Sequence, residues 1–147
     1  MSAMITPITL PHPSFAPLAH SARAEGFAFL DRLVADWDSG ANRFDRAGEC
    51  LLGAHDAETL IAVAGLNIDP YANDPACARL RHVYVAPSHR RTGTGRQLVV
   101  ALLRDAQPMF NRVRLRTTTP AAAAFYEALG FHTLNDPSAT HTYTMLK

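Results

Sequence analysis

The chain is poor in cysteine, and its metal-binding residue types do not fall into metal-binding patterns. Only Cys50 and Cys77 occur among 147 residues, whereas a secreted domain that depends on disulfides usually carries more. The seven histidines are scattered, with no H-E-x-x-H and no C-x-x-C spacing, the patterns typical of zinc sites. We therefore expect no bound metal and a reducing, cytoplasmic location.

Long apolar runs and an excess of charge are also missing. No stretch approaches the roughly 18 consecutive apolar residues that span a membrane, and residues 1–13 show no basic-then-apolar leader pattern. The formal net charge is +1, so bulk electrostatics gives no reason to attract nucleic acid or an anionic membrane. We expect neither as a partner, and any anion site must come from a local basic cluster.

The overall composition is that of a folded globular protein. Hydrophobic residues make up 48% and charged residues 18% of the chain, which excludes a disordered or strongly charged class. A length of 147 residues fits one domain with a sizeable core. We expect residues 1–147 to form a single domain.

Apolar spacing predicts a mixture of helices and strands. Helical periodicity covers residues 15–37, divided at Gly26, and residues 95–107. Thr119 before Pro120 is a typical helix start, because threonine caps the helix and proline suits its first position. Strands are predicted over 5–10, 49–54, 59–66, 80–85, 113–117, 131–134 and 141–146. This order indicates an α/β or α+β fold with a mixed sheet.

The most informative segment is residues 80–95, LRHVYVAPSHRRTGTG. A strand ends at Val85, and the basic turn that follows opens a helix. Gly93 and Gly95 let the backbone approach a ligand closely, and the unpaired N–H groups of a helix start bind phosphate. Three arginines add charge suited to paired phosphates, namely Arg90, Arg91 and Arg96. Taken alone, G-x-G also fits a tight strand–helix turn without a ligand.

Two other phosphate-binding loops fit this segment less well. A Walker loop requires a Gly-Lys pair, which the chain does not contain. A Rossmann fingerprint requires a third glycine and an acidic residue about 20 positions on, where Leu115 stands. The turn therefore belongs to a different kind of phosphate site.

The strand V-x-V-x-P followed by R-x-x-G-x-G resembles the signature of the GNAT superfamily of acyl-CoA-dependent N-acetyltransferases. Residues 122–131, AAAFYEALGF, resemble the family's second hallmark, a helix ending in F-Y-x-x-L-G-F. The two motifs occur in the family's order and at about its spacing. The resemblance implies a single GNAT-like domain with a mixed, mostly antiparallel sheet of six or seven strands, flanked by helices, in which a central strand pair is splayed. It also implies acetyl-CoA as the acyl donor.

The resemblance implies where the coenzyme binds. Its pyrophosphate would lie on the backbone N–H groups of residues 91–96, and its pantetheine would pair with the backbone of Val83 and Val85 like a further strand. The Val83 N–H would also polarise the thioester carbonyl and stabilise the oxyanion of the tetrahedral intermediate. The coenzyme-binding residues expected on this basis are Val83, Val85, Arg90, Arg91, Thr92, Gly93, Thr94, Gly95, Arg96 and Thr119.

Tyr126 resembles the family's general acid, which protonates the departing coenzyme A thiolate. A phenol with an ordinary pKa near 10 is protonated at neutral pH and able to donate. The alternative is a helix tyrosine that packs beside Phe125. Thr119 stands where many relatives carry a coenzyme-binding asparagine; its hydroxyl can substitute in part, but we favour its role as a helix cap.

The general base is not assigned. Relatives often carry a glutamate or histidine at the positions of Arg79 and Arg81, and arginine cannot accept a proton. Strand alternation predicts that the neighbouring His82 lies on the face opposite Arg81, which favours a packing role. Three possibilities stay open, namely Glu49, Asp69 and a water relay.

The acceptor is expected to contact residues 37–44, 67–76 and 135–141. Asp69 and Tyr71 offer a carboxylate and a ring that could hold an amine, whereas Arg79 and Arg81 favour a carboxylate. Together these residues suggest a small zwitterion such as an amino acid.

The function predicted is N-acetyl transfer from acetyl-CoA to a primary amine by direct attack in a ternary complex. The alternatives are a non-catalytic acyl-CoA-binding sensor and a structural protein without ligand. A homodimer is expected from the family resemblance alone.

Overall fold

The computed structural model of the protein describes residues 3–145, which form one seven-stranded sheet in the order β1-β2-β3-β4-β5-β7-β6. Every neighbouring pair is antiparallel except β4 and β5, which are parallel. The predicted mixed, mostly antiparallel sheet is thus confirmed. The strands are β1 (Met4–Pro7), β2 (Cys50–Asp56), β3 (Thr59–Ile68), β4 (Cys77–Val85), β5 (Arg112–Leu115), β6 (His132–Asp136) and β7 (Ala139–Thr144). Leu146, predicted as the last strand residue, lies outside the described residues.

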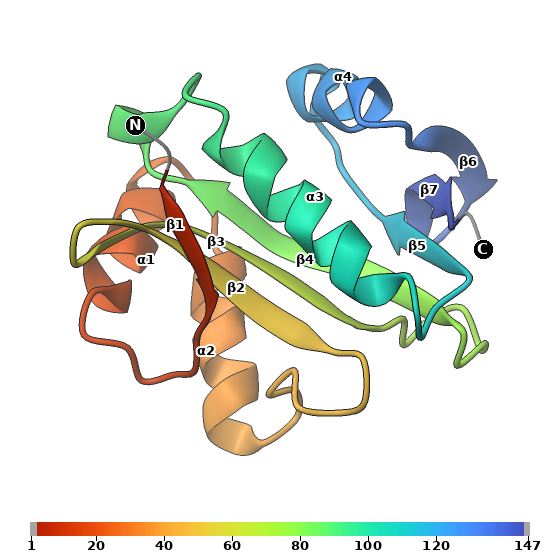
Figure 1. The fold of residues 1–147 in the computed structure, drawn as a ribbon, viewed down its shortest axis with the longest axis horizontal. Coiled ribbons are helices and arrows are strands. Elements are labelled where there is room, and N and C mark those ends of the chain that lie inside the picture. The colour runs from red at the N-terminus through yellow and green to blue at the C-terminus, as the bar shows by residue number, and fades with distance from the viewer. Residues whose placement is uncertain (1–2, 146–147) are drawn as a thin grey trace.

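Helices cover both faces of this sheet (Figure 1). Helix α3 (Thr94–Ala106) lies on one face, while α1 (Phe15–Ala24) and α2 (Phe29–Ser39) lie on the other. Helix α4 (Pro120–Ala128) follows β5. The predicted division between α1 and α2 is confirmed, and Trp37, the last residue of the predicted helical stretch, lies within α2. Between residues 3 and 145 no helix is long and apolar enough to cross a membrane.

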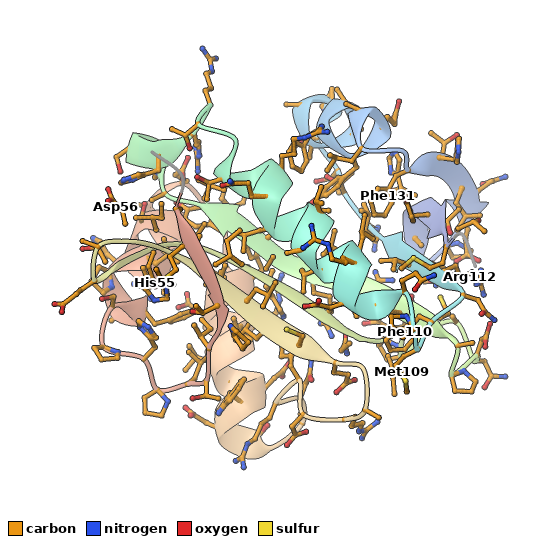
Figure 2. The ribbon with its side chains drawn as sticks, viewed as in Figure 1. His55, Asp56, Met109, Phe110, Arg112 and Phe131 are labelled. Carbon is orange, nitrogen blue, oxygen red and sulfur yellow. The ribbon has the colours of Figure 1, made fainter. Side chains whose placement is uncertain are left out.

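Two apolar clusters fill the space between sheet and helices. The α3 side buries Leu98 and Leu102 against strand residues such as Leu66 and Leu80, and it includes Phe131, which Figure 2 shows below α4. The α1 and α2 side is a separate cluster, containing Leu18, Leu30, Leu33, Phe44, Val63 and Tyr84. The amphipathic spacing of each helix therefore determines which face of the sheet it covers.

Strands β4 and β5 part from one another soon after they begin. Cys77, Ala78 and Arg79 pair with residues 112–114, but β4 continues to Val85 while β5 ends at Leu115. Residues 80–85 consequently have no strand paired on the β5 side within the described chain. This is the splayed central pair that the sequence predicts.

A β-bulge interrupts β4 beside this splay. Val63 pairs with Tyr84 and Gly65 with Arg81, so His82 and Val83 together lie opposite a single residue of β3. His82 has a φ of 60°, a left-handed conformation that histidine adopts more readily than most residues. A bulge bends its strand and breaks the simple alternation of faces. The alternation used to place His82 relative to Arg81 therefore does not hold across this point.

Candidate functional site

The turn after β4 leaves backbone N–H groups unpaired at the start of α3. The 3-10 turn η1 (Pro87–His89) follows the strand, and Arg91 (φ 64°) and Gly93 (φ 86°) both have left-handed conformations before α3 begins. The Gln97 N–H donates to Gly93 O at 3.0 Å, so the N–H groups of residues 94–96 have no acceptor within the helix. A concave run of such groups at the positive end of a helix is an anion site.

The threonines of the turn stabilise it from within. Thr92 Oγ1 donates to His89 O at 2.5 Å and lies 2.8 Å from Thr94 Oγ1. Thr94 is buried, whereas Thr92 is exposed. A Cβ placed on Gly93 would meet no atom within 4 Å, so the turn is open at its glycine. The hydroxyl groups are thus used inside the turn, and main-chain N–H groups are what it offers to an anion.

The three arginines of the turn differ in their contacts. Arg90 donates Nε to Val85 O at 3.0 Å, and its two terminal nitrogens bind the Glu25 carboxylate at 2.8 and 2.5 Å. Arg91 and Arg96 are exposed and make no hydrogen bond or ion pair with another residue between 3 and 145. The guanidinium groups available to a phosphate are therefore those of Arg91 and Arg96, while Arg90 holds the turn against α1.

Gly95 lies where β4, α3 and α4 converge. A Cβ at this position would lie 3.4 Å from Val85 Cγ2 and 3.6 Å from Phe125 Cζ. The adjacent Tyr126 is 9% exposed, and its ring packs edge-on against Phe125 and Phe131 at centroid distances of 5.1 and 5.6 Å. Burial raises the pKa of the Tyr126 hydroxyl well above its ordinary value. The group is therefore protonated at neutral pH.

The edge of β4 facing the splay carries main-chain groups. The Ala86 N–H donates to Ile61 O of β3 at 2.8 Å, and the polar groups of successive residues in a strand point to opposite edges. Those of Val85 thus point away from β3, and its carbonyl does accept from Arg90. Val83, two residues earlier, lies in the bulge and has no strand partner on the β5 side. The anion-binding turn therefore continues directly from an open strand edge.

Contacts at both ends fix α4 beside this edge. The Thr119 side chain accepts from the Ala122 N–H at 3.2 Å as the N-cap, so the capping role inferred from the sequence is confirmed. Glu127 Oε2 lies 2.9 Å from Nε2 of the buried His141 on β7. Because Glu127 follows Tyr126, this contact also holds the tyrosine in place.

The two acidic candidates for a general base are both engaged by other groups. Glu49 accepts the backbone N–H groups of Arg46 at 3.1 Å and Ile68 at 2.8 Å. Asp69 is only 3% exposed, and one of its oxygens accepts the N–H groups of Tyr71 and Ala72 at 2.7 and 3.1 Å. Neither geometry favours a role as proton acceptor.

Asp69 is the centre of a buried ionic cluster that the sequence did not reveal. Its second oxygen lies 3.0 Å from Nε of Arg114 and 3.4 Å from a terminal nitrogen of Arg79. Both arginines also bind Ser138, through its carbonyl at 2.8 Å and its hydroxyl at 2.7 Å, and Tyr71 covers Arg79 at 4.8 Å. These residues are far apart in the chain, and only the strand register brings them together. Asp69 and Tyr71 are thus occupied by arginines, which does not support their expected contact with an acceptor amine.

His82 is buried on the α1 and α2 side of the bulge. It is 8% exposed, and its ring lies 6.5 Å from that of Phe29 and 6.1 Å from that of Phe44. Burial above all, and the positive charges of Arg81 and Arg32, lower the pKa of His82 to about 3. The imidazole is therefore neutral at physiological pH and holds a proton too weakly to act as an efficient base.

Neither cysteine has the environment of a nucleophile. Cys50 and Cys77 are both free thiols. Burial raises the pKa of Cys50 to about 11 and also raises that of Cys77, so both are protonated at neutral pH. Within residues 3–145, no three His, Cys, Asp or Glu side chains are grouped so that they could hold a metal ion.

An anion-binding turn at the end of an open strand edge, with a buried tyrosine beside it, defines a site for an extended, phosphate-bearing ligand. Known structures share the whole fold. A candidate acetyltransferase from Exiguobacterium sp. 255-15 is 25% identical, with a TM-score of 0.87 over 98% of this chain and 94% of that one. The Escherichia coli ribosomal-protein-S18-alanine N-acetyltransferase is 18% identical, with a TM-score of 0.69 over 98% and 96% of the two chains.

A further similar structure was determined with coenzyme A. This GNAT family N-acetyltransferase from Escherichia coli is 18% identical, with a TM-score of 0.74 over 99% of this chain and 83% of that one. A sequence model of the acetyltransferase (GNAT) family matches residues 15–131. The chain therefore belongs to the acetyltransferase (GNAT) family, as its two motifs predict.

Proposed function

We propose that this protein transfers an acetyl group from acetyl-CoA to a primary amine by direct attack within a ternary complex. The observation that carries this proposal is the open edge of β4, which ends in a turn with unpaired N–H groups. These N–H groups, together with the exposed side chains of Arg91 and Arg96, suit a pyrophosphate. Family membership supports acyl-CoA as the donor, and so does the coenzyme A bound to one protein of the same fold.

The coenzyme would be held mainly by the main chain. Its pyrophosphate binds the N–H groups of residues 91–96, with Arg91 and Arg96 supplying positive charge. Its pantetheine lies along the β4 edge and pairs with Val83 and Val85. Arg90, expected from the sequence as a phosphate ligand, acts instead by positioning the turn. Thr119 contributes by capping α4 rather than by direct contact.

The transfer step joins the amine nitrogen to the acyl carbon. The Val83 N–H stabilises the oxyanion that forms on the thioester oxygen. When the C–S bond breaks, the sulfur takes the electron pair and receives the proton of the Tyr126 hydroxyl. The nitrogen loses its proton to water, since Glu49 and Asp69 are both bonded elsewhere. The phenolate recovers a proton from solvent, which completes the cycle.

An intermediate with the acyl group on the protein is not part of this scheme. Both thiols have a raised pKa, and a thiol, unlike a thiolate, is a poor nucleophile. Direct attack requires only that amine and thioester lie together in the splay. This predicts that both substrates are bound before any thiol is released.

The experiment that tests the proposal combines ligand binding with thiol release. Acetyl-CoA should raise the unfolding temperature of the protein by mass action, and a panel of primary amines should then release free coenzyme A. Tyr126→Phe should keep the stabilisation by acetyl-CoA but lower kcat by about a hundredfold or more. Tyr143→Phe, whose ring packs on Phe131 at 5.3 Å, is the matched control and should retain activity.

A second candidate function is an acyl-CoA sensor without turnover. The observation in its favour is that the acidic groups near the splay are bound to backbone or to arginines. Stabilisation by acetyl-CoA without thiol release for any amine would favour the sensor. Absence of any acyl-CoA effect would overturn both.

A further inference from the structure

A row of polar residues crosses the sheet on the face that α1 and α2 partly cover. Asn67 of β3 pairs with Arg79 of β4, Arg79 with Arg114 of β5, and Arg114 with Thr142 of β7. The neighbours of Arg79 in β4, Ala78 and Leu80, belong to the apolar cluster on the α3 side, so this row lies on the opposite face. A sheet face next to a core is usually apolar, and a polar row four strands wide calls for a functional reason.

Several polar atoms on this face are buried and unpaired. They are Asn67 Oδ1, Thr142 Oγ1 and both ring nitrogens of His82, by strict hydrogen-bond geometry. The Phe29 main chain lies near the His82 ring and is the smallest of the contributions to its pKa. Asn67 and His82 are only 7% and 8% exposed. Most buried polar side-chain atoms in proteins have a hydrogen-bond partner, and an unpaired one destabilises the folded state. Such a concentration of unpaired atoms at the side of the splay indicates a place where a polar ligand supplies the missing partners.

The charged groups of this polar row and Arg81 carry an excess of positive charge. The carboxylate of Asp69 is shared by Arg79 and Arg114, which leaves one positive charge in excess. Arg81 adds another, and its guanidinium group has no hydrogen bond or ion pair with the part of the chain that the structure describes. The partly exposed Asp136 lies 3.7 Å from Arg114 and offsets only part of this charge. An anionic group of a ligand is therefore favoured here.

The acceptor amine can reach the thioester from this side. The turn proposed for the coenzyme phosphates, residues 91–96, lies at the start of α3, which covers the other face of the sheet. Helix α4 contacts α3 at Gly95, so both helices lie on the coenzyme side. The bulge residue His82 immediately precedes Val83, whose N–H is assigned to the thioester carbonyl. A ligand bound against His82 and Arg81 would thus lie next to the reacting carbon.

We propose that this face binds the acceptor and that the acceptor is a small zwitterion, with a carboxylate close to its primary amine. The inference rests on the proposed acetyl transfer and specifies its substrate class. Arg81 binds the carboxylate. The ammonium of the zwitterion gives one proton to water before it attacks, and the neutral His82 ring then accepts a hydrogen bond from the resulting amine. Asn67 Oδ1 accepts from a donor farther from the splay, on the side chain of the acceptor.

The assignment follows from the hydrogen-bonding capacity of each group. A guanidinium has only donors, so Arg81 matches a carboxylate. A neutral imidazole has one acceptor nitrogen, and the Asn67 oxygen is an acceptor only, so both match N–H or O–H groups of the ligand. An amine without a carboxylate would leave Arg81 unpaired, and it should bind more weakly.

The test compares amino acids with the amines obtained by removing their carboxylate. Thiol release is measured for both series, and acceptor binding to the protein saturated with coenzyme A is measured by calorimetry. For the wild type, kcat/KM for the preferred amino acid should exceed that for its decarboxylated counterpart at least about tenfold, the loss expected when a charged hydrogen bond is missing. Arg81→Gln should raise KM about tenfold for the amino acid and leave KM for the amine unchanged.

Two further variants keep the outcome clear. Arg104→Gln removes an exposed arginine of α3 and should change neither series. Asparagine, like histidine, tolerates the left-handed φ of position 82. His82→Asn should therefore weaken acceptor binding without changing the rise in unfolding temperature that acetyl-CoA causes.

The outcomes distinguish this inference from the proposed function. Equal kcat/KM for amino acids and amines, or an equal loss for both series in Arg81→Gln, would overturn the zwitterion assignment alone. Failure of every amino acid to bind the coenzyme-saturated protein would overturn it as well. Failure of acetyl-CoA itself to bind would instead contradict the proposed acetyl transfer.

Discussion

The carboxylate of Glu25, at the end of α1, binds both terminal nitrogens of Arg90, in the turn before α3, at 2.8 and 2.5 Å. The Tyr84 hydroxyl donates to the same carboxylate at 2.5 Å. The bonds to Arg90 and then to Tyr84 lower the pKa of Glu25. One carboxylate thus links three elements, namely α1, strand β4 through Tyr84, and the turn before α3 through Arg90.

Glu25→Gln tests whether Arg90 acts by positioning the turn. Both side chains are partly exposed, so the variant should lose less than about 1 kcal/mol of stability. The Kd of the variant for acetyl-CoA should rise by less than about tenfold. The ion pair between Glu25 and Arg90 can contribute no more free energy to holding the turn than it contributes to stability. Titration calorimetry measures Kd, and urea unfolding measures stability.

The double variant Glu25→Gln, Arg90→Gln is the control. If Arg90 only positions the turn, the two substitutions together should weaken coenzyme binding no more than either alone. Arg91→Gln should act differently. Combined with Glu25→Gln, it should weaken coenzyme binding further, and this further loss should be smaller at high salt. If Arg90→Gln raised the Kd for acetyl-CoA much more than Glu25→Gln does, Arg90 would bind the phosphates directly.

Gly93→Ala and Gly26→Ala form a matched pair for the anion site. Both glycines have a left-handed φ, 86° and 89°, and a Cβ on either would meet no atom within 4 Å. Each alanine should therefore cost a similar amount of stability, about 1 kcal/mol, from backbone strain alone. Only the Gly93 variant should also lose the rise in unfolding temperature caused by acetyl-CoA. Equal binding by the two variants would show that the turn is not the phosphate site.

Asp69→Asn should be strongly destabilising. The substitution leaves the buried guanidinium groups of Arg79 and Arg114 without their counter-charge, a change that costs about 3–5 kcal/mol in comparable buried pairs. Asp38→Asn, at an exposed position of α2, should be nearly neutral. Urea unfolding of both variants measures the difference. A loss below about 1 kcal/mol for Asp69→Asn would contradict a structural role.

His82 should make the protein acid-sensitive. Its pKa in the folded state is about 3, against about 6.5 in an unfolded chain. Between these values the unfolded state binds a proton that the folded state does not, so folding stability is complete above pH 6.5 and falls as the pH decreases toward 3. The slope for one such group is about 1.4 kcal/mol per pH unit.

His82→Asn removes this group and should flatten the decline. Urea unfolding at pH 7.5 and pH 4.5 should show a loss about 3 kcal/mol smaller for the variant than for the wild type. The pKa of His12 is also lowered, by burial and then by His55, but this histidine is present in both proteins and its effect cancels. Equal losses would mean that His82 is protonated in the folded state.

The agreement between prediction and structure is best where the signal is local. Thr119 and Pro120 mark a helix start because capping and a fixed φ act within one turn of backbone, and α4 begins at Pro120 with Thr119 as its cap. Gly26 likewise separates two helices. Element ends were less accurate, as for β4, which begins at Cys77 rather than at residue 80.

The features that the sequence did not reveal depend on contacts between distant residues. Nothing near Asp69 in sequence indicates that Arg114 will bind it, since that contact needs the register of β4 with β5. The strand alternation assumed for His82 fails because a bulge adds a residue to β4. Arg90 matches a phosphate-binding pattern, yet Glu25, on another helix, determines what it contacts.

The sequence by itself determined the family, the order of helices and strands and the turn that suits a phosphate, because glycine, proline and apolar spacing act over a few residues of chain. Only the tertiary structure decided which charged side chains are bound in ion pairs within the protein and which are free to bind a ligand. A charged side chain takes its role from the partners that folding places beside it. For that reason Arg79 and Arg90 are held by carboxylates, and Arg91 and Arg96 have exposed side chains. Asn67 and His82 are buried with polar atoms that lack a strict hydrogen-bond partner.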